Sequence, residues 1–235
     1  MKLPDTTLGS EGGGNSYIAR AVIVEDQRLV AEFLQIHCRE QRLEVLQCCA
    51  GYRDALAAIR AHKPDLVLLD ISLPDGDGLD LARVIIEELP KTKLLAISSH
   101  HDPWTMLQVQ RIGIHGFVDK HDQRAEVLSE AIHAVLGGRV YYTPVVNESS
   151  ATIRRDPKSF IRVLSDYETR ILSMIGESKT DEEIAAVLAI SPATVQSRRR
   201  DIMRKLDIHS TPKLIHYAIV NGLTRAEQLG KKKPT

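Results

Sequence analysis

The sequence from residue 65 to residue 78 reads Asp65-Leu66-Val67-Leu68-Leu69-Asp70-Ile71-Ser72-Leu73-Pro74-Asp75-Gly76-Asp77-Gly78. Its four consecutive apolar residues, followed by a carboxylate and a cluster of Pro, Gly and Asp, predict a strand that is buried on both faces. Strands of this kind belong to parallel sheets covered by helices. We therefore expect Asp70 to stand at the mouth of a loop at the carboxyl end of a central strand, and we place the chemistry there.

Short apolar runs alternate with amphipathic segments of helix length on both sides of this strand. The expected strands are residues 21–24, 43–49, 66–69, 94–97 and 116–118. The expected helices are residues 28–40, 53–62, 79–88, 103–112 and 123–136. Five successive strand–helix units predict an α/β domain in which a parallel sheet lies between two layers of helices.

Polar residues follow nearly every expected strand at its carboxyl end, where the sites of doubly wound sheets form. They are Glu25-Asp26, Asp70, Ser98-Ser99 and Asp119-Lys120. Clustered carboxylates favour Mg²⁺, which takes few protein ligands and keeps positions for water and phosphate. Asp70 could then attack a phosphoryl group, while Lys120 and the Ser98 hydroxyl bind its oxygens. Each residue alone is more commonly a solvated loop residue, so the prediction depends on the whole set.

Charge divides the chain into two unlike parts. The 235 residues include 31 basic and 31 acidic side chains, so the formal net charge is zero. From Ser159 onward, however, the chain has 13 Lys and Arg residues but only 9 Asp and Glu residues. The part before Ser159 is correspondingly acidic. The length and this division predict two domains with separate roles.

The cysteines and the hydropathy pattern point to a cytosolic chain. Cys38, Cys48 and Cys49 lack metal-ligand spacing, so we expect reduced thiols that fill the core, with the last two on opposite faces of a strand. The sequence shows neither an apolar signal peptide nor an apolar run of about 18 residues that could span a membrane. We expect a soluble cytoplasmic protein.

The rear part of the chain is rich in helix-capping signals. Residues 165–168 and 180–183 each form a capping box, and Ser191-Pro192 and Thr211-Pro212 each place a cap residue before a proline. We expect helices at residues 166–177, 181–189, 192–206 and 212–222. The short connection between the second and third of these helices is typical of a helix-turn-helix.

The third of these helices carries a strongly basic run. Its apolar members Val195, Ile202 and Leu206 recur at helical intervals and are assigned to the core. Several polar members then face outward, where they could donate to phosphates and to base edges in the major groove. The predicted DNA contacts are Thr194, Gln196, Ser197, Arg198, Arg200, Arg204 and Lys205. The alternative interpretation is a solvated basic face without a ligand.

With these residues in place, the front part of the chain resembles a response-regulator receiver domain. The acidic pair, phosphoacceptor, hydroxyl switch, aromatic switch and lysine of that family are matched by Glu25-Asp26, Asp70, Ser98, Phe117 and Lys120. The resemblance implies a flavodoxin-like sheet of five parallel strands in the order 2-1-3-4-5. It also implies Mg²⁺ bound by Glu25, Asp26, Asp70 and the carbonyl of Ser72, and side chains at Ser72 and His100 that govern the phosphate lifetime.

The rear part resembles a LuxR-type helix-turn-helix domain of four helices. The matching residues are Leu164-Ser165 with Glu168, Glu183-Ile184-Ala185, Ser191 with Thr194-Val195, and Lys205-Leu206. Ala189 stands where the family usually has Gly, so a positive φ there would cost roughly 1 kcal/mol. Gln196 and Arg198 replace the usual Lys and His, so the base preference cannot be transferred.

The last helix of the rear part carries an apolar stripe. The resemblance implies that this helix forms the dimer contact on DNA, through Leu214, Ile215, Ala218 and Ile219. The alternative is that the stripe packs inward against its own domain.

Together the two resemblances indicate a response regulator of the NarL/FixJ class. The implied division is a disordered leader (1–17), a receiver domain (18–138), a linker (139–163), the LuxR-type domain (164–226) and a basic tail (227–235). Such a protein is phosphorylated by a histidine kinase, with Mg²⁺, and then dimerises and binds operator DNA to regulate transcription. It catalyses only its own phosphotransfer and dephosphorylation. The implied partners are a sensor histidine kinase, double-stranded operator DNA, a second copy of the chain and, as a further candidate, RNA polymerase.

Two other function classes stay open. The first is a transcription regulator that works without phosphorylation and keeps its receiver as a dimerisation or docking module. The second is a haloacid-dehalogenase-type phosphatase, which also combines an Asp nucleophile, Mg²⁺ and Lys. That class needs a second acid two residues after the nucleophile, where this chain has Ser72.

Overall fold

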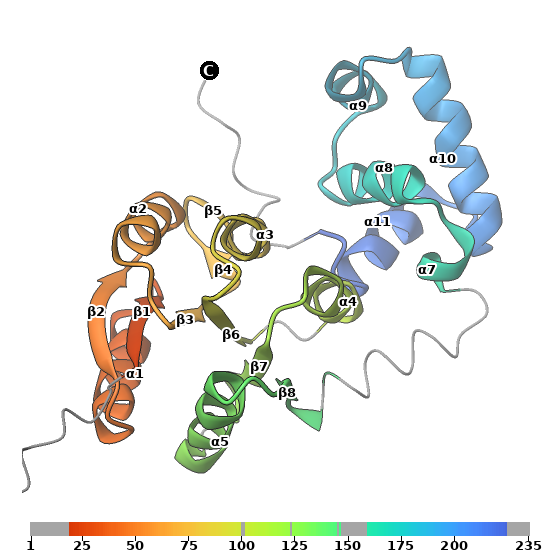
Figure 1. The fold of residues 1–235 in the computed structure, drawn as a ribbon. Coiled ribbons are helices and arrows are strands. Elements are labelled where there is room, and N and C mark those ends of the chain that lie inside the picture. The colour runs from red at the N-terminus through yellow and green to blue at the C-terminus, as the bar shows by residue number, and fades with distance from the viewer. Residues whose placement is uncertain (1–18, 100–101, 123, 145, 147–158, 225–235) are drawn as a thin grey trace, which may run out of the picture.

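The computed structural model describes residues 19–99, 102–122, 124–144, 146 and 159–224. Within these residues the chain forms an α/β domain followed by a helical domain (Figure 1). The expected leader, most of the expected linker and the basic tail lie outside the described residues. Each described helix is too short or too polar to cross a lipid bilayer.

The α/β domain is built on a six-stranded sheet. Its strands are β1 (Arg20–Val24), β2 (Glu44–Cys49), β3 (Leu66–Leu69), β6 (Lys93–Ser98), β7 (Gly116–Asp119) and β8 (Tyr141–Tyr142). The order is β2-β1-β3-β6-β7-β8, with every pair parallel. The first five strands confirm the expected order 2-1-3-4-5.

The sixth strand, β8, corrects the expectation of a five-stranded sheet. It lies within residues 139–163, where we expected a linker. The free edge of β7 explains it, because the backbone N–H groups of Tyr141 and Thr143 donate to the carbonyls of His115 and Phe117 at 3.1 and 3.2 Å. The α/β domain therefore continues at least to Thr143.

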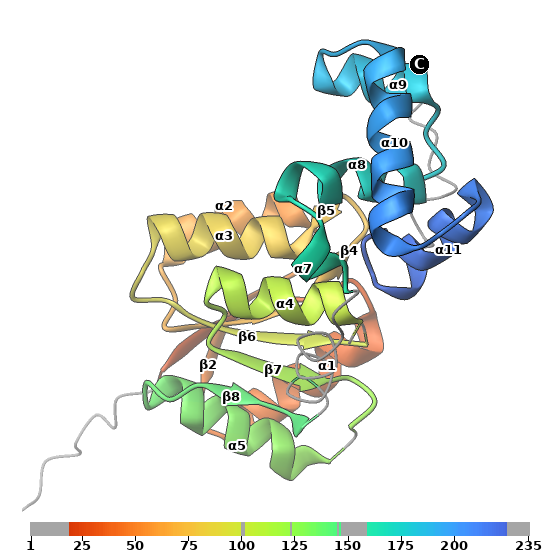
Figure 2. The ribbon, with the colours of Figure 1, turned by 90° about the vertical axis from the view of Figure 1, so that its right-hand side faces the viewer.

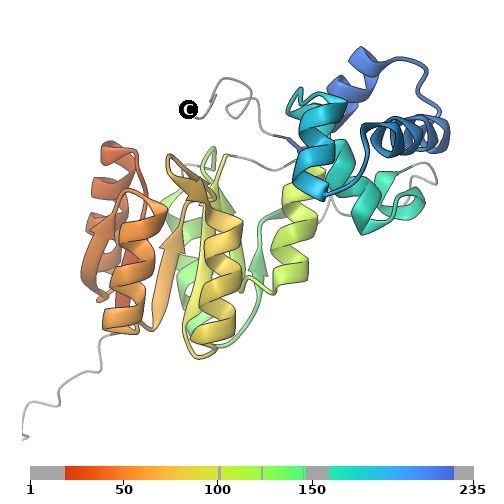
Figure 3. The ribbon, with the colours of Figure 1, turned by 90° about the horizontal axis from the view of Figure 1, so that it is seen from above.

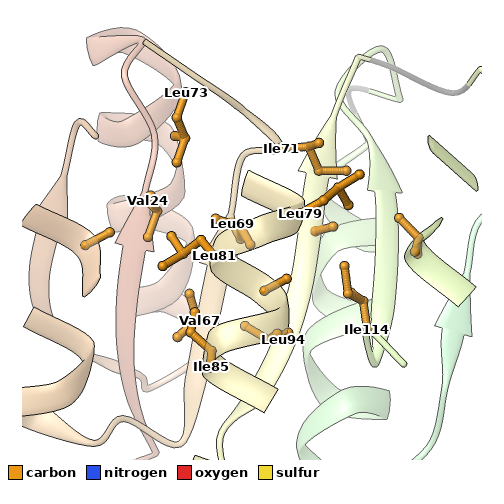
Figure 4. Packing of buried hydrophobic residues seen from close by; sticks show 14 of the residues in the cluster. Val24, Val67, Leu69, Ile71, Leu73, Leu79, Leu81, Ile85, Leu94 and Ile114 are labelled. Atoms are coloured by element: carbon orange, nitrogen blue, oxygen red, sulfur yellow. The ribbon is translucent and has the colours of Figure 1, made fainter. Parts of the chain in front are cut away.

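Helices cover both faces of the sheet in the expected three-layer arrangement (Figure 3). They are α1 (Arg28–Glu40), α2 (Tyr52–His62), α3 (Gly78–Glu88), α4 (Pro103–Ile112) and α5 (Ala125–Leu136). Alternate strand residues point to opposite faces: Val67 and Leu69 pack in one core with α2, α3 and α4 (Figure 4), whereas Leu66 and Leu68 pack in another with α1 and α5. Burial on both faces explains the unbroken apolar run that precedes Asp70.

A small hairpin follows β3 and was not expected. Strands β4 (Ser72–Leu73) and β5 (Gly76–Asp77) pair antiparallel and bring the chain from Asp70 to the start of α3. The Asp77 carboxylate accepts a hydrogen bond from the backbone N–H of Leu79 at 2.8 Å and so caps α3. The Pro/Gly/Asp cluster that we interpreted as a loop is thus an ordered connection.

The helical domain has five described helices. They are α7 (Phe160–Val163), α8 (Asp166–Gly176), α9 (Asp181–Leu188), α10 (Pro192–Leu206) and α11 (Thr211–Val220). The last four confirm the predicted helices to within two residues at each end, and both capping boxes are formed. The short helix α7 is an addition to the expected four, and it forms because Phe160 is buried in the core of the domain, with 1% of its surface exposed.

Ala189 ends α9 in the left-handed conformation, with φ 54° and ψ 43°. We expect Ala189→Gly to raise the free energy of unfolding by about 0.5–1 kcal/mol, because glycine adopts this conformation without the Cβ clash. Denaturant unfolding measures the change. Ala186→Gly is the control, since it places the same substitution inside α9, where it should destabilise by about 1 kcal/mol. Equal losses of stability in the two variants would contradict this prediction.

The cysteines are free, as expected, but they do not all fill the core. Cys48 and Cys49 point to opposite faces of β2, and this confirms their predicted alternation. Cys38 and Cys49 are buried, whereas Cys48 is exposed and lies on β2, the edge strand of the sheet.

Candidate functional site

Three carboxylates meet at the carboxyl end of the sheet. Because β1 and β3 are paired with Val24 opposite Leu69, the residues that follow them, Glu25 and Asp70, are brought side by side. Together with Asp26 they offer oxygens that all lie within 4.8 Å of one another. Glu25 and Asp70 are buried, with 4% and 3% of their surfaces exposed, and Asp26 is exposed. The structure thus brings together the acidic set that the sequence predicted.

Lys120 is the basic partner of this cluster. It follows β7, and its Nζ lies 2.8 Å from Asp70 Oδ2 and 2.7 Å from Glu25 Oε2. Burial opposes protonation of the amine, but the bonds to Asp70 and Glu25 outweigh it and hold the pKa of Lys120 above its usual value. For Glu25, burial is the dominant effect and raises the pKa of the carboxyl even though Lys120 opposes this.

The donor set fits a hard divalent cation. Within the described residues, the ammonium of Lys120 lies against two of the three carboxylates, so the cluster keeps an excess of negative charge. Clustered carboxylate oxygens of this kind are suited to Mg²⁺. Ser72 lies at the start of the hairpin, and its backbone N–H donates to Asp70 Oδ1 at 3.0 Å. Ser72, whose carbonyl is the expected fourth ligand, is therefore held beside Asp70.

The two predicted switch residues lie on neighbouring strands. Ser98 ends β6, is fully buried and is paired in register with Asp119 of β7, next to Lys120. Phe117 is also fully buried and packs in the core shared with α2, α3 and α4. Its ring, which has no hydroxyl, therefore packs inward. His100 lies outside the described residues.

Helix α10 presents the predicted polar face to solvent. Val195, Ile202 and Leu206 are buried in the core of the helical domain, which confirms their assignment. Arg199 forms an ion pair with Asp181 of α9, and this pair links the two helices of the helix-turn-helix. The exposed polar residues in the first half of the helix are Thr194, Gln196, Ser197, Arg198 and Arg200.

The two predicted contacts at the end of α10 are engaged within the domain. Lys205 donates to both carboxylate oxygens of Glu168 at 2.8 and 2.7 Å, and Glu168 is buried and also caps α8. Lys205 is therefore a structural residue, because moving it to DNA would leave a buried carboxylate uncompensated. Arg204 pairs with Asp201 at 2.8 Å, but it stays largely exposed and remains a candidate phosphate contact.

The apolar stripe of α11 divides into two sets. Leu214 and Ala218 are fully buried in the domain core, so they are not available to a partner and their predicted role in dimerisation is corrected. Helical periodicity placed all four predicted residues on one stripe, but the inner half of that stripe packs against α8. Ile215 and Ile219 are half-exposed and remain candidates for a dimer contact.

Helix α4 of the α/β domain contacts the helical domain (Figures 1 and 2). The Trp104 ring packs against the core of the helical domain with its centre 5.7 Å from that of Phe160, and the Trp104 backbone N–H donates to the carbonyl of Asn221 at 3.1 Å. Next to it, Gly222 has a φ of 72°, and a Cβ there would clash with the Asp102 side chain, so the position favours glycine. Figure 1 shows α10 on the side of the helical domain that faces away from α4.

We did not predict Trp104 as a functional residue. The sequence carried one signal for it: Trp104 is the only tryptophan of the chain and stands in the first turn of the helix that follows β6, the strand that ends at the predicted switch residue Ser98. Which surface the ring would meet depends on how the domains pack, and no local pattern encodes that.

A groove between α1 and α5 opens beside the acidic cluster. It is open to solvent, has a volume of about 400 Å³ and is lined by Leu29, Phe33, Val118 and Lys120, among others. Leu29 and Phe33 are unusually exposed for apolar residues, at 81% and 47%. An exposed apolar surface next to a reactive site is typical of a docking site.

Comparisons with known families agree with this division. Residues 21–132 match the family described as response regulator receiver domain. Residues 162–218 match the family described as bacterial regulatory proteins, luxR family. The two matches cover the α/β domain with its acidic cluster and the helical domain with α10.

Relatives and solved structures share both domains. Oxygen regulatory protein NreC of Staphylococcus carnosus is 31% identical over 214 residues, which cover 87% of this chain and 98% of that protein. The protein of the same name from Staphylococcus haemolyticus is 31% identical over 217 residues, with the same coverage. RcsB from Salmonella enterica serovar Typhimurium, solved on promoter P1flhDC with a phosphomimetic, aligns with a TM-score of 0.62 over 86% of this chain and 98% of that one. At 20% identity this last match shows a shared fold alone.

Proposed function

Because the chain belongs to the response regulators that join a receiver domain to a LuxR-type DNA-binding domain, we propose that a histidine kinase phosphorylates Asp70 and thereby promotes dimerisation and operator binding. The observation that carries the proposal is the buried placement of Asp70 against Lys120, within a carboxylate cluster suited to Mg²⁺. We place the protein in the cytoplasm, where kinase and DNA are both accessible.

Asp70 is the nucleophile of the proposed transfer. One of its carboxylate oxygens forms a bond to phosphorus while the bond between phosphorus and the imidazole nitrogen of the kinase breaks. Lys120, already 2.8 Å from Asp70 Oδ2, pairs with the new phosphate as a point charge. Glu25, Asp26, Asp70 and the Ser72 carbonyl would hold Mg²⁺, which lowers the repulsion between the carboxylate and the incoming phosphoryl group.

The end of β6 carries the signal toward DNA. Ser98 would donate a hydrogen bond from its hydroxyl to the phosphate, and Phe117 would repack beneath it. The receiver domain would thereby pass from one packing to another whose free energy differs by only a few kcal/mol. Only five residues separate Ser98 from Trp104, which lies at the contact with the DNA-binding domain. A shift of β6 and α4 would therefore loosen that contact. The DNA-binding domain, once released, dimerises through α11 and places α10 in the major groove.

We place the kinase in the groove between α1 and α5. Its exposed apolar residues Leu29 and Phe33 lie on the same surface as Lys120, so a helix docked there would face the site of transfer.

We expect Phe33→Asp to slow phosphotransfer from a kinase that phosphorylates the wild type by about tenfold or more, because a charge would be buried in an apolar contact. Labelling by a small phosphodonor should stay within about twofold, since the groove plays no part in that reaction. The control is Val140→Asp, an equally polar change at an exposed apolar residue that does not line the groove. Equal rates from the kinase for Phe33→Asp and the wild type would place the kinase elsewhere.

One experiment tests the proposed function as a whole. The wild type, with and without a small phosphodonor and Mg²⁺, is incubated with a random-sequence duplex DNA pool, and bound DNA and mass in solution are measured. We expect phosphodonor to increase both dimer formation and the recovery of an enriched sequence. If the protein takes up no phosphate, is already dimeric and recovers the same DNA in both conditions, it works without phosphorylation and its receiver is a docking module.

A further inference from the structure

Helix α2 is capped by a carboxylate from a distant part of the chain. Its own N-cap residue is Gly51, which has no side chain to accept a hydrogen bond. Instead, the Asp75 carboxylate accepts bonds from the backbone N–H groups of Tyr52, at 2.6 Å, and Arg53, at 3.3 Å. Asp75 stands between β4 and β5, at the tip of the hairpin that follows the phosphoacceptor. The hairpin is therefore fastened to the start of α2.

Two glycines allow this close approach. A Cβ on Gly51 would lie 2.6 Å from Asp75 Oδ1, and a Cβ on Gly76 would lie 2.8 Å from the Tyr52 side chain. Real Cβ atoms almost never come so close to another heavy atom. Gly51 has an extended backbone, with φ −158°, so it is needed there for space alone. A side chain at either Gly51 or Gly76 would therefore disturb this contact.

The hydrogen bonds of Asp75 connect two chain segments that flank the acidic cluster. On one side, the hairpin begins with Ser72, whose backbone N–H donates to Asp70 Oδ1 at 3.0 Å. On the other side, Gly51 lies two residues after Cys49, whose carbonyl accepts the backbone N–H of Glu25 at 2.9 Å. The Asp75 carboxylate consequently links the segment that carries Ser72 to the segment that fixes Glu25.

The bonds that Asp75 accepts favour its ionised form. Partial burial opposes ionisation, but the backbone N–H groups of Tyr52 and Arg53 outweigh this effect and hold the pKa of Asp75 below its ordinary value. The positive end of the α2 dipole acts in the same direction.

We propose that Asp75 is a positioning residue for the cation site: by capping α2 it sets the distance between the Ser72 carbonyl and the carboxylates of Glu25 and Asp70. This role rests on the proposed function, because it concerns the same cation site. Asp75 itself does not belong to the set of clustered carboxylates. Its contribution is to hold ligands from two chain segments at the spacing that a small octahedral cation demands.

The test measures binding of Mn²⁺ alone, by electron paramagnetic resonance, to the full chain without phosphodonor. Mn²⁺ is also a hard cation and prefers the same oxygen ligands as Mg²⁺. We expect Asp75→Ala to weaken Mn²⁺ binding by about threefold to tenfold, the range set by the loss of one helix cap. Asp75→Asn should stay within about twofold, because its amide oxygen still accepts the Tyr52 bond.

A second pair of variants separates position from charge. Asp80→Ala removes one exposed carboxylate of α3 and should leave binding unchanged. Gly51→Ala alters no charge but forces a Cβ against Asp75, so it should weaken Mn²⁺ binding in the same direction as Asp75→Ala. In the double variant Gly51→Ala/Asp75→Ala, the second change should add little, because the carboxylate that the Cβ meets is gone. Circular dichroism and thermal melts confirm that each variant is folded.

The outcomes distinguish this proposal from the proposed function. If the wild type binds Mn²⁺ and Asp75→Ala binds it equally well, Asp75 does not position the site, although the cation site stands. If Asp75→Asn and Asp75→Ala lose affinity equally, the effect is one of charge, and the positioning role is wrong. If the wild type binds no Mn²⁺ and takes up no phosphate, both proposals fail.

Discussion

Asp70→Asn is expected to reduce phosphoryl incorporation from a small phosphodonor to the level measured without donor. The reason is chemical, because an amide is not a nucleophile at this position and cannot form an acyl phosphate. Within the cluster, Asp70 is the carboxylate whose oxygens contact both Lys120 and the Ser72 N–H, so it is the one placed at the centre of the site. Intact-protein mass spectrometry, with and without hydroxylamine to release acyl phosphate, measures the incorporation.

A loss of folding should not explain that result. The substitution removes one of three neighbouring negative charges, so it relieves repulsion and should leave the melting temperature equal or higher. The control is Asp80→Asn, which changes an exposed carboxylate on α3 and should be labelled like the wild type. Labelling of Asp70→Asn at the wild-type level would move the phosphoacceptor to another residue.

Trp104→Ala is expected to tighten DNA binding by the unphosphorylated protein by about tenfold to a hundredfold. The variant removes the ring that packs against Phe160 and the core of the DNA-binding domain. Losing a large half-buried side chain from this contact costs about 1.5–3 kcal/mol. This free energy corresponds to a rise of about tenfold to a hundredfold in the population whose domains are separated. Because the contact also involves Asn221 at the end of α11, separation frees the helix that we propose for dimerisation.

Two measurements check this prediction on a DNA sequence recovered from the random-sequence selection. Fluorescence anisotropy gives the affinity, and small-angle scattering gives the radius of gyration, which should increase in Trp104→Ala. Trp104→Phe is the control, because it keeps an aromatic ring against Phe160 and should behave much like the wild type. An unchanged affinity together with a larger radius would mean that domain contact does not restrain DNA binding.

The main features of the fold follow from local patterns in the sequence. The run 66–69 is unbroken because β3 is covered on both faces, and Asp70 lies at the carboxyl end where such sheets form their sites. Capping boxes fixed the starts of α8 and α9, since their signals lie within four residues. Ala189 adopts the left-handed conformation that its place at the turn required. These features depend on neighbours along the chain.

The features that the sequence did not predict depend on contacts between distant segments. Strand β8 is only two residues long and exists because β7 offers a free edge. The sequence predicts Lys205 as a DNA contact, but in the structure Lys205 binds Glu168, which is 37 residues away along the chain. Helical periodicity placed Leu214 on the correct stripe, but periodicity does not tell a domain core from a dimer contact. Asp75 caps a helix that starts 23 residues earlier, so no local capping signal precedes α2.

The position of Trp104 gives the protein an intrinsic optical reporter. Its indole is the only one in the chain and lies at the contact between the two domains. Emission excited at the red edge of protein absorption therefore comes from this single ring, and its wavelength depends on whether the ring is packed against Phe160 or surrounded by water. A titration with phosphodonor in a stopped-flow fluorimeter could thus follow domain separation in real time, with unlabelled wild-type protein.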